Sequence, residues 1–171
     1  IGTVLTDNPM LNCRIENGRN PIRIVCDSKL RIPLDCNICK TANEISTLVV
    51  SAIENPEKQS ELEKMGVKTL ILPDKNGKVD LKKLMQYLGE KSIDSVLIEG
   101  GGTLAYSALQ SKIVSHIYSY IAPKIFGGEN AKTPVESVGV ETPDDCFKLK
   151  RTNVRELGSD ILIEYDVLEV Q

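Results

Sequence analysis

The pattern of apolar and polar positions alternates between strand-like and helix-like segments through most of the chain. Short apolar runs indicate strands at five places, which are residues 21–28 (PIRIVCDS), 46–51 (STLVVS), 67–73 (VKTLILP), 95–99 (SVLIE) and 116–123 (HIYSYIAP). Helical spacing occurs in residues 56–65, in residues 81–91 behind a capping Asp80, and in residues 103–111. Strands that alternate with helices in this way predict an α/β domain with a mostly parallel sheet.

The end of the chain follows a different pattern. Residues 147–157 and 161–170 alternate polar and apolar positions around a turn at residues 158–160, which predicts an antiparallel hairpin. Residues 129–145 are rich in proline and acidic side chains, and we expect a surface loop there. We therefore expect a single domain, residues 1–171, with helices on both faces of a central sheet and the hairpin at its edge.

The composition is that of an ordinary globular domain, and its main use is to exclude some classes of function. Hydrophobic residues make up 41% of the 171 residues and charged residues 26%. The net charge of −3 gives no general attraction for nucleic acid or an anionic membrane. No apolar run has the roughly 20 residues that span a bilayer, and no signal peptide is visible. We expect a cytoplasmic protein.

The five cysteines favour reduced thiols, because their number is odd and no secretory signal accompanies them. Cys36 and Cys39 form a CxxC, but His116 is the only histidine in the chain. A redox pair would begin a helix directly after a strand, and this segment shows no such pattern. We expect two incidental thiols in a loop, and no metal site.

The strongest chemical signal is the junction between the fourth expected strand and the helix behind it, residues 95–109 (SVLIEGGGTLAYSAL). Parallel α/β sheets bind ligands at the carboxyl ends of their strands, where glycines let the backbone approach a ligand closely. The unpaired amides that begin a helix favour anions. Gly100 to Thr103 therefore predict a phosphate cradle, and Thr103 and Ser107 add hydroxyls on one helix face. The alternative is a tight connection that needs glycine only for its geometry.

The same junction leaves two other interpretations open. Gly100, Gly102 and Ala105 fit the dinucleotide fingerprint G-x-G-x-x-G/A. Residues 120–126 lack the carboxylate that would then hold a ribose, so a classical Rossmann dehydrogenase is the runner-up. Glu99 can bond the hydroxyls or nitrogens of a ligand, or it can satisfy nearby backbone amides.

The start of the chain carries a weaker signal. Gly2 and Thr3 are expected to end a strand, and residues 7–9 (Asp-Asn-Pro) to form a turn. Arg14 follows, and its planar fork of donors suits a phosphate. On its own, this segment is equally well explained as a loop with one surface arginine.

Four segments together make the chain similar to a known family. GTVLTDNPMLNCR, NPIRIVCDSKLRIP, VLIEGGGTLAYSAL and YIAPKIFGG occur in this order, at similar spacing, in the reductase domain of bacterial riboflavin-biosynthesis proteins. The resemblance covers nearly the whole chain. It implies a dihydrofolate-reductase-like fold, NADPH as cofactor, and reduction of 5-amino-6-(5-phosphoribosylamino)uracil to its ribitylamino product. It also implies a homodimer and, in bacteria, a common fusion behind a zinc-dependent deaminase domain.

The resemblance also assigns individual residues. The positions that would contact the cofactor are Thr3, Asp7, Ser28, Gly101, Gly102, Thr103, Leu104, Ala105, Tyr106 and Ser107. The positions that would contact the substrate are Leu11, Arg14 and Glu99, with Arg14 on the substrate phosphate and Glu99 in the catalytic role. For the 2′-phosphate of NADPH, our hypothesis is Ser28 together with Lys29 or Arg31.

The chain departs from the family at its start. It begins at Ile1 without Met, and the opening strand and helix of the reductase domain are missing, so we expect a fragment of a longer chain. The deaminase signature, H-x-E followed by P-C-x-x-C, is absent, and we expect no deaminase activity. Two other functions stay open, a non-catalytic dinucleotide-binding domain and a structural dimerisation module. A thermal shift with NADPH separates the last of these from the rest.

Overall fold

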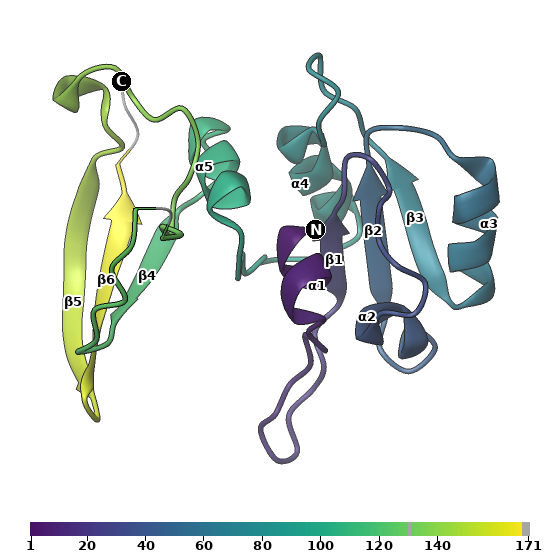
Figure 1. The fold of residues 1–171 in the computed structure, drawn as a ribbon, viewed down its shortest axis with the longest axis horizontal. Helices are drawn as coiled ribbons and strands as arrows, with labels where there is room; N and C mark the ends of the chain where they lie inside the picture. Colours follow the sequence, from purple (N-terminus) through teal and green to yellow (C-terminus); the bar gives the residue numbers. More distant parts are fainter. Residues whose placement is uncertain (130, 169–171) are drawn as a thin grey trace. The chain divides into compact units, whose positions relative to one another are not determined.

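The computed structural model describes residues 1–129 and 131–168 (Figure 1). It divides the chain into two compact units, Ile1–Val96 and Leu97–Gln171, which we call the first and the second unit. Each unit contains a three-stranded sheet, parallel in the first and antiparallel in the second. The expectation of a single domain stays a prediction, and the units are described one at a time below.

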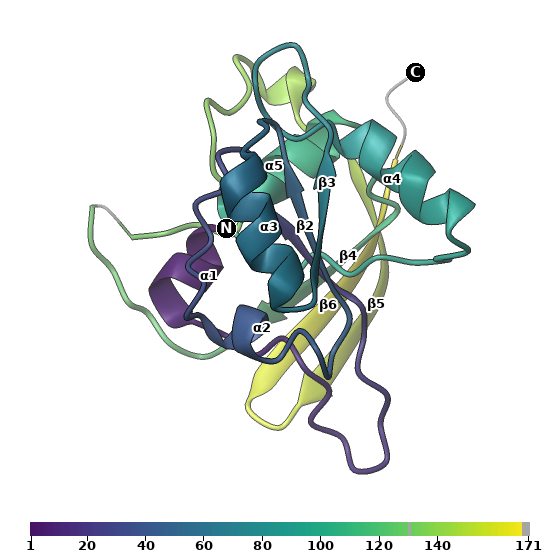
Figure 2. The ribbon, with the colours of Figure 1, turned by 90° about the vertical axis from the view of Figure 1, so that its right-hand side faces the viewer.

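The first unit is an alternation of helices and parallel strands. Its elements are α1 (Gly2–Asp7), β1 (Arg23–Cys26), α2 (Asn37–Lys40), β2 (Thr47–Ser51), α3 (Pro56–Lys64), β3 (Val67–Ile71) and α4 (Leu81–Glu90). The strand order is β1-β2-β3. In Figures 1 and 2 these strands lie between α3 and α4. Three of the expected strands and two of the expected helices are therefore confirmed.

Two of these helices begin where the sequence provides a capping side chain. Asn55 accepts a hydrogen bond from the Lys58 amide at 3.1 Å, and Pro56 occupies the first turn of α3. The Asp80 carboxylate accepts from the Lys83 amide at 3.0 Å at the start of α4, as predicted. Each cap satisfies an amide that the helix itself leaves unpaired.

The core of the first unit is built around the middle strand. All five residues of β2 are buried, which fits a parallel strand that is covered on both faces. A cluster of buried apolar side chains surrounds it, and its members are Val4, Val25, Leu30, Ile32, Cys36, Ile38, Cys39, Ala42, Val49, Leu62 and Val67. The loops that follow the strands of the first unit are therefore attached to a tightly packed core.

The second unit contains one long helix and the antiparallel sheet. Its elements are α5 (Gly102–Gln110), β4 (His116–Ile121), the 3-10 turn η1 (Pro143–Asp145), β5 (Leu149–Leu157) and β6 (Asp160–Val167). The strand order is β4-β6-β5, with a register shift between Arg151 and Asn153. The predicted hairpin is confirmed, although the last two residues of its second strand, Glu169 and Val170, lie outside the described residues. Residues 131–145 are almost entirely exposed, as expected of a surface loop.

Three local expectations are wrong. Residues 95–99 form no strand, and Leu97 is 72% exposed, because an apolar run becomes a strand only where another strand pairs with it. Gly2 and Thr3 begin the helix α1, which the buried Val4 holds against the core. Cys36 and Cys39 are not in a loop, since Cys36 caps α2 and Cys39 lies within it, both buried.

Within the described part of the chain, no helix combines the length and the apolar character that crossing a membrane requires.

Candidate functional site

The glycine-rich junction has the backbone geometry that its composition predicted. Gly101 is the N-cap of α5 with φ of 77°, a conformation that side chains other than glycine rarely adopt. Its carbonyl accepts from the amides of Leu104 and Ala105 at 2.9 and 3.0 Å. A Cβ at Gly101 would meet only Leu104, 4.0 Å away, so the space beside this residue is open. A ligand can therefore approach the turn at Gly101.

Gly102 has a structural reason of its own. A Cβ built on it would lie 2.8 Å from the backbone nitrogen of Glu136 and 2.6 Å from Glu136 Cγ. The loop that follows β4 in the chain thus packs directly on the first residue of α5. The Glu136 carboxylate is engaged elsewhere, since its Oε1 accepts from the Thr133 amide at 3.0 Å. Gly102 serves close backbone packing, and Gly101 is the glycine that leaves room for a ligand.

No side chain caps α5 among the described residues. The first amides of the helix, at Gly102 and Thr103, are therefore donors of the kind that bind an anion. Ser107 lies one turn further along, and its hydroxyl donates to the Thr103 carbonyl at 2.8 Å. The expected pair of hydroxyls does share a helix face, but the Ser107 proton is already used within the helix.

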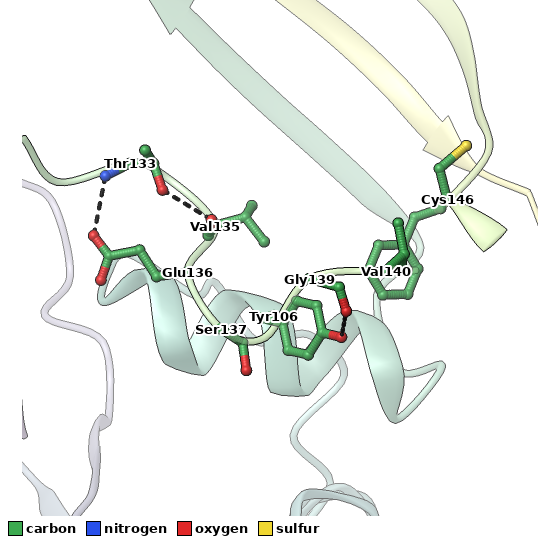
Figure 3. Close-up of a pocket in the computed structure, with 9 residues that line it drawn as sticks. Tyr106, Thr133, Val135, Glu136, Ser137, Gly139, Val140 and Cys146 are labelled. Carbon is green, nitrogen blue, oxygen red and sulfur yellow. Dashed lines mark hydrogen bonds between the residues drawn. The ribbon is translucent and has the colours of Figure 1, made fainter. Parts of the chain in front are cut away.

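Tyr106 is held inside the second unit. Its side chain is buried, and its hydroxyl donates to the Gly139 carbonyl at 2.7 Å (Figure 3). The same hydroxyl accepts from Gln110 at 3.2 Å. Its ring meets Phe147 edge-on, with the ring centres 5.9 Å apart. The geometry gives Tyr106 a packing role that the sequence did not signal, and its assignment to the cofactor stays a prediction.

A pocket of about 370 Å³ lies between α5 and the loop over it (Figure 3). Its walls are Tyr106, Thr133, Val135, Glu136, Ser137, Gly139, Val140, Cys146 and Phe147. None of these except Tyr106 was named from the sequence. Residues 131–147 carry no motif of fixed spacing, so composition could identify a loop there but not a cavity.

Glu99 is exposed in the irregular segment that precedes the glycines. Because residues 95–99 form no strand, Glu99 is not at a strand end, and the argument for it as a strand-end carboxylate fails. Its position two residues before Gly101 still places it in the same segment as the open side of the turn. The roles of Glu99 in substrate binding and catalysis stay predictions.

The other predicted site residues belong to the first unit. Thr3 and Asp7 lie on α1, and Asn8 ends this helix in a left-handed conformation with φ of 43°. Leu11 also has a positive φ, of 48°, and its partly buried side chain packs against the core. Arg14 is exposed in the loop that follows. One short segment therefore presents two predicted cofactor positions and two predicted substrate positions.

Ser28 lies just beyond the carboxyl end of β1, as expected. Its hydroxyl oxygen accepts from the Val79 amide at 3.2 Å, and its carbonyl accepts from the Ala52 amide at 3.1 Å. The turn that brings in Val79 is fixed by Asp74, and the amides of Lys78 and Asn76 hold the pKa of that carboxyl below its usual value. Ser28 thus joins three loops at the edge where parallel sheets bind ligands.

Lys29 and Arg31 follow Ser28 on the same turn, and both are exposed. Arg31 Nε lies 3.8 Å from Oδ1 of the buried Asp27. The other Asp27 oxygen accepts from the Ile32 amide at 2.7 Å, which closes the turn. A phosphate near Ser28 could therefore meet Lys29 freely, whereas Arg31 already has an acidic neighbour.

The predicted site residues thus form two groups, one in each unit. The first unit contributes side chains from α1, its following loop and the end of β1, and the second unit contributes backbone amides at the start of α5. Across residues 1–129 and 131–168, no three His, Cys, Asp or Glu side chains group closely enough to hold a metal ion. Both groups suit an anionic organic ligand.

The chain is similar to proteins of one family along almost its entire length. The family model described as the RibD C-terminal domain matches residues 1–163. The riboflavin biosynthesis protein RibD of Actinobacillus pleuropneumoniae is 46% identical over 168 residues, which are 98% of this chain and 45% of that protein. The 2,5-diamino-6-ribosylamino-4(3H)-pyrimidinone 5′-phosphate reductase of Methanothermobacter thermautotrophicus is 34% identical over 171 residues, covering 98% of this chain and 77% of that enzyme.

Solved structures of similar proteins have the same fold. RibD of Acinetobacter baumannii matches with a TM-score of 0.82 at 27% identity, over 98% of this chain and 45% of the other. The riboflavin biosynthesis reductase Rib7 of Saccharomyces cerevisiae matches with a TM-score of 0.70 at 26% identity, over 98% and 72%. The dihydrofolate-reductase-like α/β class expected from the resemblance is confirmed. The chain spans less than half of the two RibD proteins and about three quarters of the stand-alone reductases.

Proposed function

Because the chain belongs to the RibD C-terminal domain family, we propose that it is a pyrimidine reductase of riboflavin biosynthesis. Its substrate is 5-amino-6-(5-phosphoribosylamino)uracil, its reductant is NADPH, and its product is the ribitylamino pyrimidine phosphate. The observation that carries the proposal is the match of the family over residues 1–163, which include every residue assigned to the site. The printed names support the reaction class, since the Methanothermobacter enzyme is a pyrimidinone phosphate reductase, and a Thermotoga maritima protein of known structure, 26% identical with a TM-score of 0.74, is named as a 5-amino-6-(5-phosphoribosylamino)uracil reductase as well as a deaminase.

The residues of the glycine turn fit the diphosphate of a dinucleotide. Gly101 leaves open space, and the amides of Gly102 and Thr103 carry no side-chain cap among the described residues. The positive end of a helix stabilises a negative group by about 0.3–1 kcal/mol at an exposed site. Bound NADPH would supply a hydride, and the chain would supply its position and exclude competing reactions.

The reaction needs one hydride and one proton. The ribose ring would open at the bond between its anomeric carbon and the ring oxygen as the proton of the amino nitrogen passes to that oxygen, which gives a hydroxyl and a carbon–nitrogen double bond to the pyrimidine. Hydride supplied by bound NADPH to that carbon and a proton supplied to the nitrogen would then complete the amine and the ribityl chain. In this scheme Arg14 holds the 5′-phosphate, Leu11 packs against the substrate, and Glu99 bonds the sugar hydroxyls. Holding the opened sugar against the reductant is the main contribution of the protein.

The pyrimidine itself offers a choice between two substrates. The Thermotoga maritima relative of known structure is named for the uracil, whereas the Methanothermobacter enzyme is named for the diaminopyrimidinone. The two rings differ at C2, where the uracil carries an acceptor oxygen and the diaminopyrimidinone a donor amine. We propose the uracil, because it is the substrate implied by the resemblance to bacterial riboflavin-biosynthesis proteins, and the bacterial RibD of Actinobacillus is 46% identical whereas the diaminopyrimidinone reductase is 34% identical.

An absorbance assay tests the activity. The protein in its natural length is mixed with NADPH and each of the two pyrimidine phosphates, and the loss of NADPH absorbance is followed. We expect NADPH to be oxidised in the presence of either pyrimidine and not in controls without a pyrimidine. We also expect a higher kcat/KM for the uracil than for the diaminopyrimidinone. No oxidation of NADPH with either ring would refute the enzyme, and a melting temperature still raised by NADPH would then indicate a non-catalytic binding domain.

A pair of glycine variants tests the site of the diphosphate. Gly101 and Gly77 have similar backbone angles, with φ of 77° and 70°, and neither has close neighbours beyond Leu104. Gly101→Val and Gly77→Val therefore impose similar backbone strain. We expect Gly101→Val to block NADPH binding in a fluorescence titration, while Gly77→Val binds normally. Equal affinities in the two variants would show that the diphosphate binds elsewhere.

The proposed protein acts as a homodimer in the cytoplasm. Because the Thermotoga maritima protein is named as a deaminase as well as a reductase, and the chain spans 45% of RibD of Actinobacillus, a deaminase domain in the same protein is part of the proposal. Apolar side chains on β4, β5 and β6 that stay exposed are consistent with an interface, and they include Tyr118, Tyr120, Val154, Leu157 and Ile161. Light scattering after size exclusion gives the mass directly. A monomer at micromolar concentration would contradict the dimer.

A further inference from the structure

Arg23, at the start of β1, is a buried cation whose partners are all neutral. It is 2% exposed, and its five N–H groups make six contacts at hydrogen-bond distance, because the two hydrogens of Nη2 are shared among three acceptors. Two go to the Thr47 hydroxyl at 3.0 and 2.7 Å, and one goes to the Thr41 hydroxyl at 2.8 Å. The other three reach the carbonyl oxygens of Ile38, Ile45 and Met10, each at 3.0 Å. No carboxylate is among these partners.

Burying a guanidinium this way is costly unless every donor is satisfied. Burial lowers the pKa of Arg23, and the nearby thiols of Cys39 and Cys36 oppose that shift. The group nevertheless stays protonated, because arginine does not lose its proton in proteins. A threonine or leucine would fill a strand position at lower cost. An arginine at this buried position therefore points to a role for its fork of donors.

That fork reaches the segment that carries the proposed substrate contacts. Nη1 of Arg23 bonds the carbonyl of Met10, the residue directly before Leu11. Leu11 has a positive φ of 48°, a strained conformation for a leucine that persists only where the surroundings fix it. Arg14 follows three residues later. The Met10 carbonyl is thus a fixed point immediately before the proposed contacts.

A second anchor is connected to the same network. The Thr41 hydroxyl, which accepts from Arg23, donates to the Asn37 carbonyl at 2.7 Å. Asn37 in turn exchanges two hydrogen bonds with Asn8, since its amide donates to Asn8 Oδ1 at 2.8 Å and its Nδ2 donates to the Asn8 carbonyl at 2.7 Å. Asn8 and Met10 are therefore held from one connected set of donors and acceptors.

We propose that Arg23 is a positioning residue for the pyrimidine substrate, acting through the Met10 carbonyl and, by way of Thr41 and Asn37, through Asn8. It touches neither substrate nor cofactor, and it fixes the backbone that presents Leu11 and Arg14. This inference rests on the proposed function of those two residues. The buried guanidinium of Arg23 therefore supports binding of the substrate and not only folding of the chain.

The test measures KM for each of the two reactants separately. In Arg23→Lys, which keeps the charge and loses the fork, we expect KM for the pyrimidine to rise about tenfold while KM for NADPH changes less than about twofold. Asn37→Ala removes only the Nδ2 donor at the edge of the network, and we expect a rise of about threefold in the same KM. This second variant keeps the test decisive if Arg23→Lys does not fold.

Two controls separate positioning from loss of stability. Thr47→Val removes two bonds of Arg23 on the side away from Met10, so we expect a lower melting temperature with an unchanged KM for the pyrimidine. Asn43→Ala repeats the Asn37 substitution at an exposed position six residues further along, and we expect it to be silent.

Two results would overturn the proposal. One is an unchanged pyrimidine KM in folded Arg23→Lys and Asn37→Ala, and the other is a rise as large in Thr47→Val. If instead the unmodified protein oxidises no NADPH with either pyrimidine, the proposed function has failed, which is a separate result.

Discussion

The two units of the chain treat their apolar residues very differently. All five residues of β2 in the first unit are buried, whereas all nine residues of β5 in the second are exposed. The connected core cluster lies entirely in the first unit, and in the second the buried apolar side chains are Tyr106, Ala108, Leu109 and Leu162. The first unit therefore carries its site residues on a buried, hydrogen-bonded framework. The second presents backbone amides on a helix end and an exposed sheet.

This difference predicts which substitutions matter most for stability. Leu62 is fully buried in the first unit, and Leu149 is 39% exposed in the second. We expect Leu62→Ala to cost about 2–5 kcal/mol of unfolding free energy, because it removes packed atoms and leaves a cavity. Leu149→Ala should cost less than about 1 kcal/mol. Urea unfolding followed by circular dichroism measures both losses of unfolding free energy. Similar losses in the two variants would contradict the proposed difference in packing between the two units.

The two units are also expected to differ in how their cysteines make stability depend on pH. Burial, and then the hydrogen bond with Cys36, raise the pKa of Cys39 from 9.0 to about 12. The folded thiol keeps its proton to higher pH than the unfolded one, so its contribution to stability is complete below about pH 9 and is lost as the pH rises toward 12. Above pH 9 we expect stability to fall by up to about 1.4 kcal/mol per pH unit from this group.

Urea unfolding at pH 8, 9 and 10 measures that slope. Cys39→Ala should flatten it, whereas the same change at the exposed Cys146 should leave it as it was. A slope that is identical in all three proteins would assign the alkaline effect to other groups, such as the lysines and tyrosines.

A helix cap in the first unit gives a smaller effect. Asp80 accepts from the Lys83 amide and begins α4, whose Leu84 and Leu88 are buried. We expect Asp80→Ala to cost about 1 kcal/mol, the usual loss for a cap of this kind. Asp80→Asn retains an acceptor and should recover most of the loss in the same urea experiment. An equal loss in both variants would indicate that the charge near Lys83, rather than the cap, is responsible.

The smallest effect is expected at an ion pair of the second unit. Arg155 Nη2 lies 2.7 Å from Glu164 Oε1, and the two side chains are 54% and 23% exposed. Solvent screens such a pair, so Arg155→Ala should cost at most about 0.5 kcal/mol, and less at high salt. A loss of unfolding free energy as large as that of Asp80→Ala would mean that this ion pair stabilises the sheet more than expected for a solvent-exposed pair.

The parts of the fold that the sequence predicted correctly are those governed by local chemistry. The apolar run before Asp27, the capping Asp80 and the alternating pattern around Gly158 each determine structure within a few residues. Two predictions were wrong: a strand end was expected at Gly2, where a helix begins, and a strand was expected around Val96, where there is none. The helix depends on the packing of Val4 against distant residues, and a strand at Val96 would depend on a neighbouring strand to pair with. Neither is visible in a local pattern.

The candidate site divides in the same way. The positive φ at Gly101 is a conformation that glycine favours, so that part of the site could be predicted from the sequence. The open space beside Gly101 depends on its neighbours, since Gly102 has no such space. The contact of Glu136 with Gly102 joins residues 34 positions apart, and the bond from Arg23 to Met10 joins a strand to a loop. Such contacts depend on tertiary packing, and one sequence carries no signal for them.

A crystal structure with NADPH bound tests the central claim most directly. The account predicts that the diphosphate oxygens lie within hydrogen-bond distance of the Gly102 and Thr103 amides, on the open side of Gly101. A diphosphate bound away from the start of α5 would contradict the account, whatever activity the protein shows.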